Sequence, residues 1–453
     1  MKTCKHLLTL LVIITSFSCK KYLDAKPDAT LATPAGLNDL QGLLDYYRGM
    51  NTQFPGGTGV LSDNYYLLSN NWASIYRSDQ RSYYIWQKDA TNTQDWNSPY
   101  NSIYTCNTVL ESLKSLSVNT SEKSTADNIK GEALFFRASF HYGIAQLFTK
   151  GYNKTTASTD LGIPLRLSTD FTERSVRATL EETYQQIIAD FKQAAQLLPL
   201  QVNIKSRPSK AAAYGALART FLAMSDYEEA FKYADSCLQL ANTLIDYNTL
   251  DSNASAPFAR FNDEVIFQAI SFPAQPLNPS ICKIDSNLYS SYSADDLRKV
   301  VCFKRNNDGS HKFKGDYDGT ANNGNGHSFT GIVTDEQYLI RAECAARLGE
   351  TGQAKSDINH LLNNRLRAGT YIPVTTSDQD SLLRIVLDER RKELLFRGTR
   401  WTDMKRLNSE PEFATEVKRI IDGTNYVLPK GEIKYVPLIP QKIIDISGIK
   451  QNP

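Results

Sequence analysis

Apolar residues at helical spacing mark most of this chain, and the clearest example lies between Pro208 and Leu240. Two apolar runs there are separated only by Ser225 and Asp226. Apolar residues that recur every three to four positions predict amphipathic helices, and so short a break predicts an antiparallel helical hairpin. One hairpin cannot bury its own apolar face, so we expect further helical hairpins stacked on it.

The residue types of this hairpin match a tetratricopeptide repeat. Ala218 and Ala230 are small enough to let the two helices approach closely, and other positions carry the packing residues of the repeat: Tyr214, Leu217, Phe221, Ala234 and Cys237. Helical patterns also mark residues 34–49, 96–116, 126–149, 180–198, 335–366 and 380–407. The sequence therefore predicts an all-α fold of tetratricopeptide-like hairpins, with repeats at about residues 96–240 and 335–407.

Two long irregular segments interrupt the predicted helices. Residues 51–81 are rich in Gly, Asn and aromatic residues, and we expect a loop there. Residues 241–334 contain four prolines and a predicted β-hairpin around the turn Asn306-Asn307-Asp308-Gly309. We also expect a strand at residues 84–89 and an extended, proline-rich end at residues 426–453. Long irregular segments in a compact domain usually carry function.

The N-terminus has the pattern of an export signal. Lys2 and Lys5 precede an apolar run from Leu7 to Ile14, which is too short for a permanent membrane span. Ser16-Phe17-Ser18-Cys19 is similar to a lipobox, in which the cysteine becomes lipidated. We therefore predict a signal peptide at residues 1–18, a lipid anchor on Cys19 and a single domain at residues 19–453. The alternative is a plain secretory signal in which Cys19 is incidental.

Charge and motif content exclude several classes of protein. The net charge is +2 with no long basic run, which argues against nucleic acid as a partner. The chain has no GxSxG, HExxH or Gly-rich phosphate loop, so we predict no catalytic residues, no cofactor and no enzyme activity. Five cysteines follow Cys19 without CxxC spacing, which argues against a zinc site. Cys282 and Cys302 both lie in the loop-rich region of a chain with a predicted export signal, and whether they form a disulfide stays open at this point.

Segments spread over nearly the whole chain form a joint pattern. They are CKKYLDAKPDA, RASFHYGIAQLF, LGIPLRLSTDFTERSV followed by TYQQIIADFKQAAQLLP, RRKELLFRGTRWTDMKRL and VPLIPQKIIDISGIKQNP. In their order and spacing these segments resemble the SusD/RagB family, the nutrient-binding outer-membrane lipoproteins of Bacteroidota. Two residues depart from the usual family pattern: Arg397 replaces a Glu before Gly398, and Ile444 replaces an acidic residue.

The resemblance implies a helical platform whose variable loops bind a ligand. It implies a lipid-anchored protein of the outer membrane that faces the cell exterior, sits as a lid on a SusC-like TonB-dependent transporter and delivers oligosaccharides to it without catalysis. Some relatives take peptides, so a peptide ligand remains an alternative. A tetratricopeptide scaffold that binds only the transporter is another.

Sugar binding needs aromatic faces beside planar polar groups. Residues 64–81 supply both, and the predicted ligand-binding residues of this segment are Tyr65, Tyr66, Asn71, Trp72, Tyr76 and Arg77. We expect Trp72 to stack on the ligand; its alternative is burial in the base of the loop. Trp86 and Trp96 are predicted to be structural.

The second long segment supplies the other predicted ligand-binding residues. They are Tyr289, Tyr292 and Tyr317, with Phe313, His327 and Phe329 nearby. The oxygen-rich residues Asp316, Asp318, Asn322, Asn323 and Asn325 lack the ligand spacing of an EF-hand, so we predict a solvated loop rather than a calcium site. Asp295-Asp296 before Arg298 predicts a structural ion pair.

Overall fold

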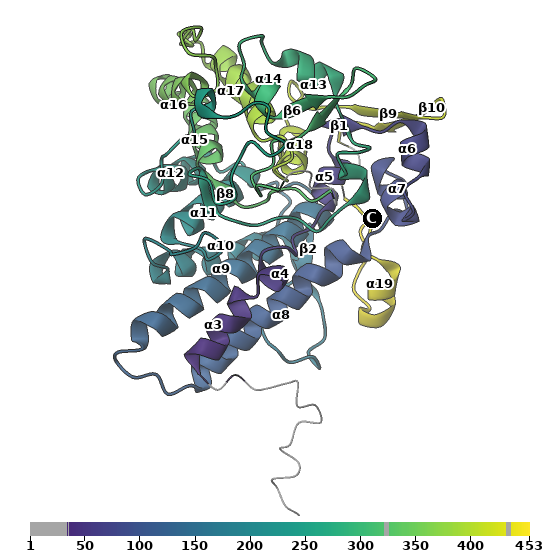
Figure 1. The fold of residues 1–453 in the computed structure, drawn as a ribbon. Helices are drawn as coiled ribbons and strands as arrows, with labels where there is room; N and C mark the ends of the chain where they lie inside the picture. The colour runs from purple at the N-terminus through teal and green to yellow at the C-terminus, as the bar shows by residue number, and fades with distance from the viewer. Residues whose placement is uncertain (1–33, 35, 321–325, 432–435) are drawn as a thin grey trace, which may run out of the picture.

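A stack of antiparallel helices forms the body of the protein (Figure 1). The computed structural model describes residues 34, 36–320, 326–431 and 436–453. The predicted signal peptide, Cys19, Asn322, Asn323 and Asn325 lie outside the described residues. The stack consists of α8 (Thr93–Ser115), α9 (Lys123–Phe148), α10 (Leu180–Leu197), α11 (Lys210–Ala223), α12 (Tyr227–Leu238), α15 (Thr334–Arg347), α16 (Thr351–Asn363) and α17 (Gln379–Glu393). Each helix contacts the next along the stack, and α17 also packs on α15. The predicted all-α hairpin architecture is confirmed.

The hairpin of α11 and α12 forms as its sequence predicts. The side chains of Ser209 and Asp226 cap the two helix N-termini, where each accepts a hydrogen bond from a free backbone N–H. Ser225 takes a positive φ of 58° in the turn. Ala218 and Ala230 are fully buried between the helices, and the rings of Phe221 and Tyr233 stack at 5.5 Å.

Shorter elements pack around the stack (Figure 1). The helices are α3 (Leu37–Asp45), α4 (Tyr47–Met50), α5 (Gly57–Leu61), α6 (Ser69–Ala73), α7 (Ser78–Tyr84), α13 (Ser286–Ser291), α14 (Arg298–Val301), α18 (Arg400–Leu407) and α19 (Gln441–Ser447), with 3₁₀ turns at Tyr247–Thr249 and Gln275–Leu277. None of the helices in the described part of the chain is both long enough and apolar enough to cross a membrane.

Short strands join in antiparallel pairs. The pairs are β1 (Tyr65–Tyr66) with β5 (Lys283–Ile284), β2 (Leu161–Pro164) with β3 (Arg177–Thr179), β4 (Val265–Phe267) with β8 (Ile332–Val333), β6 (Phe303–Arg305) with β7 (His311–Phe313), and β9 (Val417–Ile421) with β10 (Thr424–Leu428). The predicted hairpin is β6–β7, and Gly309 supplies the positive φ of 83° that its turn requires. That prediction is confirmed.

Three local predictions are wrong. Residues 84–89 form no strand: α7 ends there, Trp86 takes a φ of 52°, and its indole Nε1 donates to the carbonyl of Leu61. Residues 51–81 are not one loop, because α5, β1 and α6 lie within them and α7 begins there. The C-terminal end is not simply extended, because it contains β10 and α19. Trp86 and Trp96 are both buried, at 4% and 5% exposure, as predicted for structural residues.

His141, in α9, makes the stability of the fold depend on pH. Its side chain is fully buried and neither ring nitrogen has a hydrogen-bond partner among the described residues. Burial lowers the pKa of His141 to about 3 from an ordinary value of 6.5. Below pH 6.5 the unfolded chain therefore binds a proton that the folded chain excludes, so acidification through that pH removes stability.

Between about pH 6.5 and pH 4.5, the unfolding free energy of the wild-type protein should fall by about 2 kcal/mol more than that of the His141→Leu variant. The reason is that each pH unit changes this free energy by about 1.4 kcal/mol for each proton that the folded protein excludes. Urea unfolding at both pH values measures the difference. Other titrating groups act equally in both proteins, so an identical pH dependence would contradict the assignment to His141.

Candidate functional site

The two irregular segments of the sequence meet in space. Tyr65 and Tyr66 in β1 pair with Ile284 and Lys283 in β5. Asn71 adds a side-chain hydrogen bond from its Nδ2 to the carbonyl of Ile281 at 3.4 Å. The residues of segments 65–81 and 281–313 that are not buried thus form one surface, at the upper right of Figure 1, which we call the loop face.

Aromatic side chains form part of the loop face. Tyr76 follows α6 and is 81% exposed. Tyr66 is half-buried in β1, and Tyr289 of α13 stacks on His311 of β7, with ring centres 3.5 Å apart. Burial lowers the pKa of His311, which keeps its imidazole neutral near pH 7. The loop face therefore offers at least one fully open ring and one rigid stacked pair.

Ion pairs hold the polar groups of the loop face in place. Arg77 Nη2 lies 2.5 Å from Asp79 Oδ2. Lys283 Nζ lies 2.5 Å from Asp308 Oδ2, and its hydrogen bond lowers the pKa of the Asp308 carboxyl. Such fixed groups suit the recognition of paired hydroxyls, because little side-chain freedom is lost on binding.

Trp72 takes a different position from the one we expected. It is half-buried against the core, and its Nε1 donates to the carbonyl of Arg81 at 3.1 Å. This geometry corresponds to the alternative, burial in the base of the loop. Tyr76 is the open ring of the same segment.

Three predicted ligand-binding tyrosines lie inside the protein. Tyr65 is 3% exposed, Tyr292 2% and Tyr317 fully buried. Their hydroxyls donate to the carbonyl of Val60, the carbonyl of Lys392 and the carboxylate of Glu264 respectively. A ligand at the surface cannot reach these rings, so we leave all three out of the loop face.

The oxygen-rich segment differs from expectation, and the question left open for the cysteine pair has an answer. Asp316 and Asp318 are each 5% exposed, so this part of the expected solvated loop is buried. His327 Nε2 lies 3.4 Å from Asp318 Oδ2, and Phe329 is buried beside Tyr317. Cys282 and Cys302 are free thiols.

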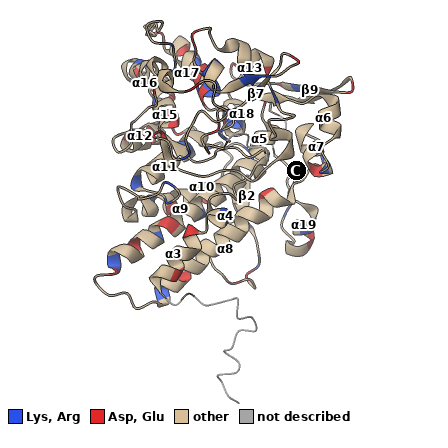
Figure 2. Ribbon diagram, viewed as in Figure 1, with Lys and Arg blue, Asp and Glu red and all other residues tan. Residues whose placement is uncertain are grey.

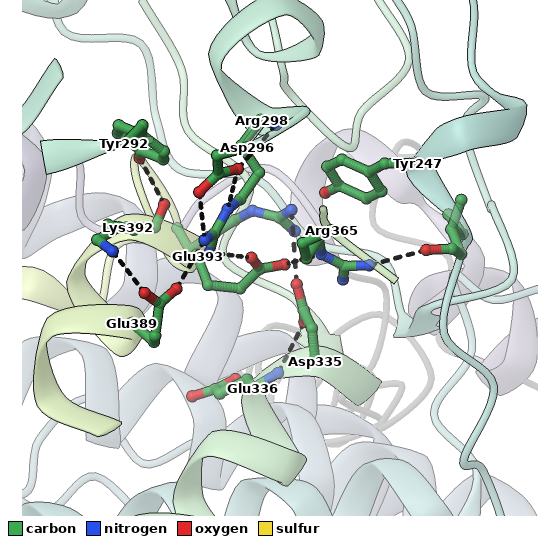
Figure 3. Close-up of polar contacts among 12 residues, drawn as sticks. Tyr247, Tyr292, Asp296, Arg298, Asp335, Glu336, Arg365, Glu389, Lys392 and Glu393 are labelled. Carbon is green, nitrogen blue, oxygen red and sulfur yellow. Dashed lines mark hydrogen bonds and ion pairs between the residues drawn. The ribbon is translucent and has the colours of Figure 1, made fainter. Parts of the chain in front are cut away.

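A buried network of charges lies beneath the loop face (Figure 3). Arg365 Nη2 lies 2.7 Å from Glu264, and its Nε lies 2.7 Å from Glu393. Arg298 contacts Glu393 at 2.9 Å and Asp296 at 2.7 Å, which confirms the predicted ion pair. Arg298 also contacts Glu389 at 2.6 Å. These ion pairs attach Glu264 and helix α14, which lie in the long irregular segment, to helix α17 of the stack.

Three carboxylates of this region resemble a metal site in spacing alone. One oxygen each from Glu264, Asp335 and Glu393 lies within 4.8 Å of the others. Arg365 already bridges Glu264 and Glu393, so the positive charge that a cation would supply is present in the protein. Burial raises the pKa of Asp335 well above its usual range, which favours a neutral carboxyl there. The arrangement is a structural ion network.

Removing one arginine from the network should be costly. Arg365→Met leaves Glu264 and Glu393 buried without their shared cation, and we expect a loss of about 3–5 kcal/mol in unfolding free energy. Arg384→Met is the matched control, because Arg384 pairs with Glu412 at the surface, where each side chain is 52% exposed. Its loss should be below about 1 kcal/mol. Chemical denaturation that gave similar losses for both variants would contradict the importance of the network.

The sequence analysis missed a second aromatic surface. Tyr104 of α8, 53% exposed, and Phe171, 89% exposed, line a groove of about 250 Å³ that α19 closes. Asn107 fixes the segment that forms the opposite wall of the groove, because its Nδ2 donates hydrogen bonds to the carbonyls of Arg166 and Ser168 at 3.0 and 3.2 Å. We call this the side groove. The sequence feature that could have revealed this groove is Phe171, an isolated aromatic residue between polar residues.

An array of helical hairpins that carries an exposed aromatic surface is the scaffold of a binding protein. Two family models match this chain: one described as "Starch-binding associating with outer membrane" over residues 21–222, and one described as "SusD family" over residues 260–453. Together they cover both halves of the sequence. The chain belongs to the SusD/RagB family.

Individual relatives agree with this assignment. The protein named SusD-like protein P2 of Formosa agariphila is 22% identical over 468 residues, which cover 89% of this chain and 90% of that protein. A SusD superfamily structure from Bacteroides thetaiotaomicron matches with a TM-score of 0.73 and 19% identity, covering 92% of this chain and 99% of that one. Surface glycan-binding protein A from Bacteroides uniformis matches at 0.71 and 16%, with 92% and 99% covered. The two structures show that the fold is shared.

Proposed function

We propose that this protein binds an oligosaccharide at the loop face without cleaving it and passes it to a SusC-like TonB-dependent transporter in the outer membrane. The observation that carries the proposal is the exposed ring of Tyr76, with the half-buried rings of Tyr66 and Tyr289, beside fixed ion pairs. The axial C–H face of a pyranose packs on such rings, while charged and amide groups bond its hydroxyls. The name of the Bacteroides uniformis neighbour, a glycan-binding protein, supports the same ligand class.

The charges of the loop face support binding rather than hydrolysis. A glycosidase needs a carboxylic acid whose pKa is raised, so that it can protonate the leaving oxygen. Asp308 lies 2.5 Å from Lys283, and its pKa is lowered. This carboxylate is not suited to donate a proton near pH 7.

Tyr76→Ala and Tyr289→Ala should each weaken glycan binding about fivefold or more, since an aromatic contact is worth about 1 kcal/mol beyond its buried area. Calorimetry against a panel of glycans and peptides measures this. Tyr46→Ala is the control, because Tyr46 is 60% exposed between α3 and α4, away from the loop face. The variants of the exposed rings, Tyr76→Ala and Tyr46→Ala, should melt like the wild type, whereas Tyr289→Ala removes a half-buried ring and should melt at a lower temperature.

Several results would contradict the proposal. New reducing ends formed at a catalytic rate would show an enzyme. A response to peptides alone would favour the peptide-binding alternative. A panel without any response, with the transporter still co-purifying, would favour a scaffold that binds only protein.

The side groove favours a second role, docking to the transporter. Its aromatic lining residues Tyr104 and Phe171 are 53% and 89% exposed, and two apolar residues beside the lining, Val176 and Ile446, are 67% and 75% exposed. The polar groups around them are engaged within the protein, as Asn107 and Glu111 hold residues 166–169. We propose that this rigid apolar surface contacts the transporter, because apolar aromatic anchors dominate protein interfaces.

Phe171→Ser should reduce co-purification of the transporter severalfold without changing the melting temperature. Ile372→Ser is the matched control, since Ile372 is 83% exposed in the loop between α16 and α17. Affinity purification from membranes, quantified by the ratio of the two proteins, gives the result. Equal ratios for both variants would place the docking surface elsewhere.

A further inference from the structure

A cavity of about 80 Å³ lies against the helical stack, and we call it the interior cavity. Helices α9, α11, α17 and α18 contribute to its wall. One side is apolar and includes Phe54, Phe135 and Phe267. The other side is polar and includes Thr330, Arg390, Arg397 and Thr399.

Several polar residues that line the interior cavity carry hydrogen-bond donors that are unpaired in the described part of the chain. Arg390 Nη1, Arg397 Nη1, Thr330 Oγ1 and Thr399 Oγ1 are all buried, and none has a hydrogen-bond partner among the described residues. An unpaired buried donor costs about 1–3 kcal/mol, and more when it is charged. Four such atoms around one cavity are therefore a reason to expect a ligand that accepts hydrogen bonds.

Of these groups, the charged side chain of Arg397 has the greatest need of a hydrogen-bonded partner. Arg219 and Arg406, also at the cavity, each form paired hydrogen bonds with a carboxylate. Arg397 has a single carboxylate within 4.0 Å in the described part of the chain, Asp335 at 3.9 Å, and the pKa of Asp335 favours its neutral form. The guanidinium instead lies 3.2 Å from the centre of the Tyr317 ring. A buried cation without a hydrogen-bonded counter-ion is costly.

We propose that the interior cavity binds a small monocarboxylate with a short apolar tail. The carboxylate accepts hydrogen bonds from Arg390, Arg397 and the threonine hydroxyls, and charge-assisted bonds of this kind are strong. The tail packs on the phenylalanine side. One water needs about 10–15 Å³, so the cavity has room for a ligand of about five non-hydrogen atoms.

Propionate is the probe, and propionamide is its neutral isostere. Calorimetry on the wild-type protein should show binding of propionate and at least about tenfold weaker binding of propionamide, because one charge-assisted hydrogen bond is worth about 1.5–3 kcal/mol. The double variant Thr330→Val/Thr399→Val should weaken propionate binding at least about tenfold. Its melting temperature should not fall, since the two hydroxyls have no partner in the protein.

A crystal structure of the protein grown with propionate tests the location, and a carboxylate between Arg390 and Arg397 would support the proposal. Ordered water alone in the cavity would overturn it. Equal affinity for propionate and propionamide, or full affinity in the double valine variant, would do the same. Glycan titrations of the double variant serve as a control for the loop face, which should be unaffected.

Discussion

The structure depends on one buried interaction above all, the contact of Arg365 with both Glu264 and Glu393. Glu393 belongs to α17 of the helical stack, whereas Glu264 precedes β4 in the long irregular segment. Each ion would be too costly to bury alone, so the three groups are stable only together. The guanidinium therefore fixes where the irregular segment sits on the helices, and with it the orientation of everything that the segment carries.

This arrangement separates two physical tasks. The helices bury apolar surface in a regular way, with small residues such as Ala218 and Ala230 at the closest contacts. The irregular segments are held instead by specific polar contacts: the ion network, the β1–β5 pair and the bond from Asn71 to Ile281. Surface rings such as Tyr76 can therefore vary without disturbing the core, because they contribute little to burial.

Sequence periodicity predicted the helices well, because burial of an apolar stripe requires that periodicity. The β6–β7 hairpin was also predictable, since Gly309 and its neighbours demand a particular turn. Trp86 was misread, because a short aromatic run is compatible with either a strand or a helix end, and only the contact with Leu61 decides. Tyr65 and Tyr66 are adjacent yet lie on opposite sides of β1, so composition alone could not tell which ring is accessible.

Long-range contacts were beyond prediction for a different reason. Nothing local in Arg365 or Arg397 distinguishes a buried arginine from a surface one; burial follows from carboxylates and rings that arrive from distant parts of the chain. The side groove was missed likewise, because α19 joins α8 only in the folded protein.

The β1–β5 pair has a further consequence for how the loop face moves. Each strand contains two residues, so few backbone hydrogen bonds join the two halves of the face. Tyr65 and Ile284, at 3% and 2% exposure, pack into the same core as the helices. The two halves are therefore held together mainly by this shared core, so that loosening it would release the loop face and the helices together rather than the face alone.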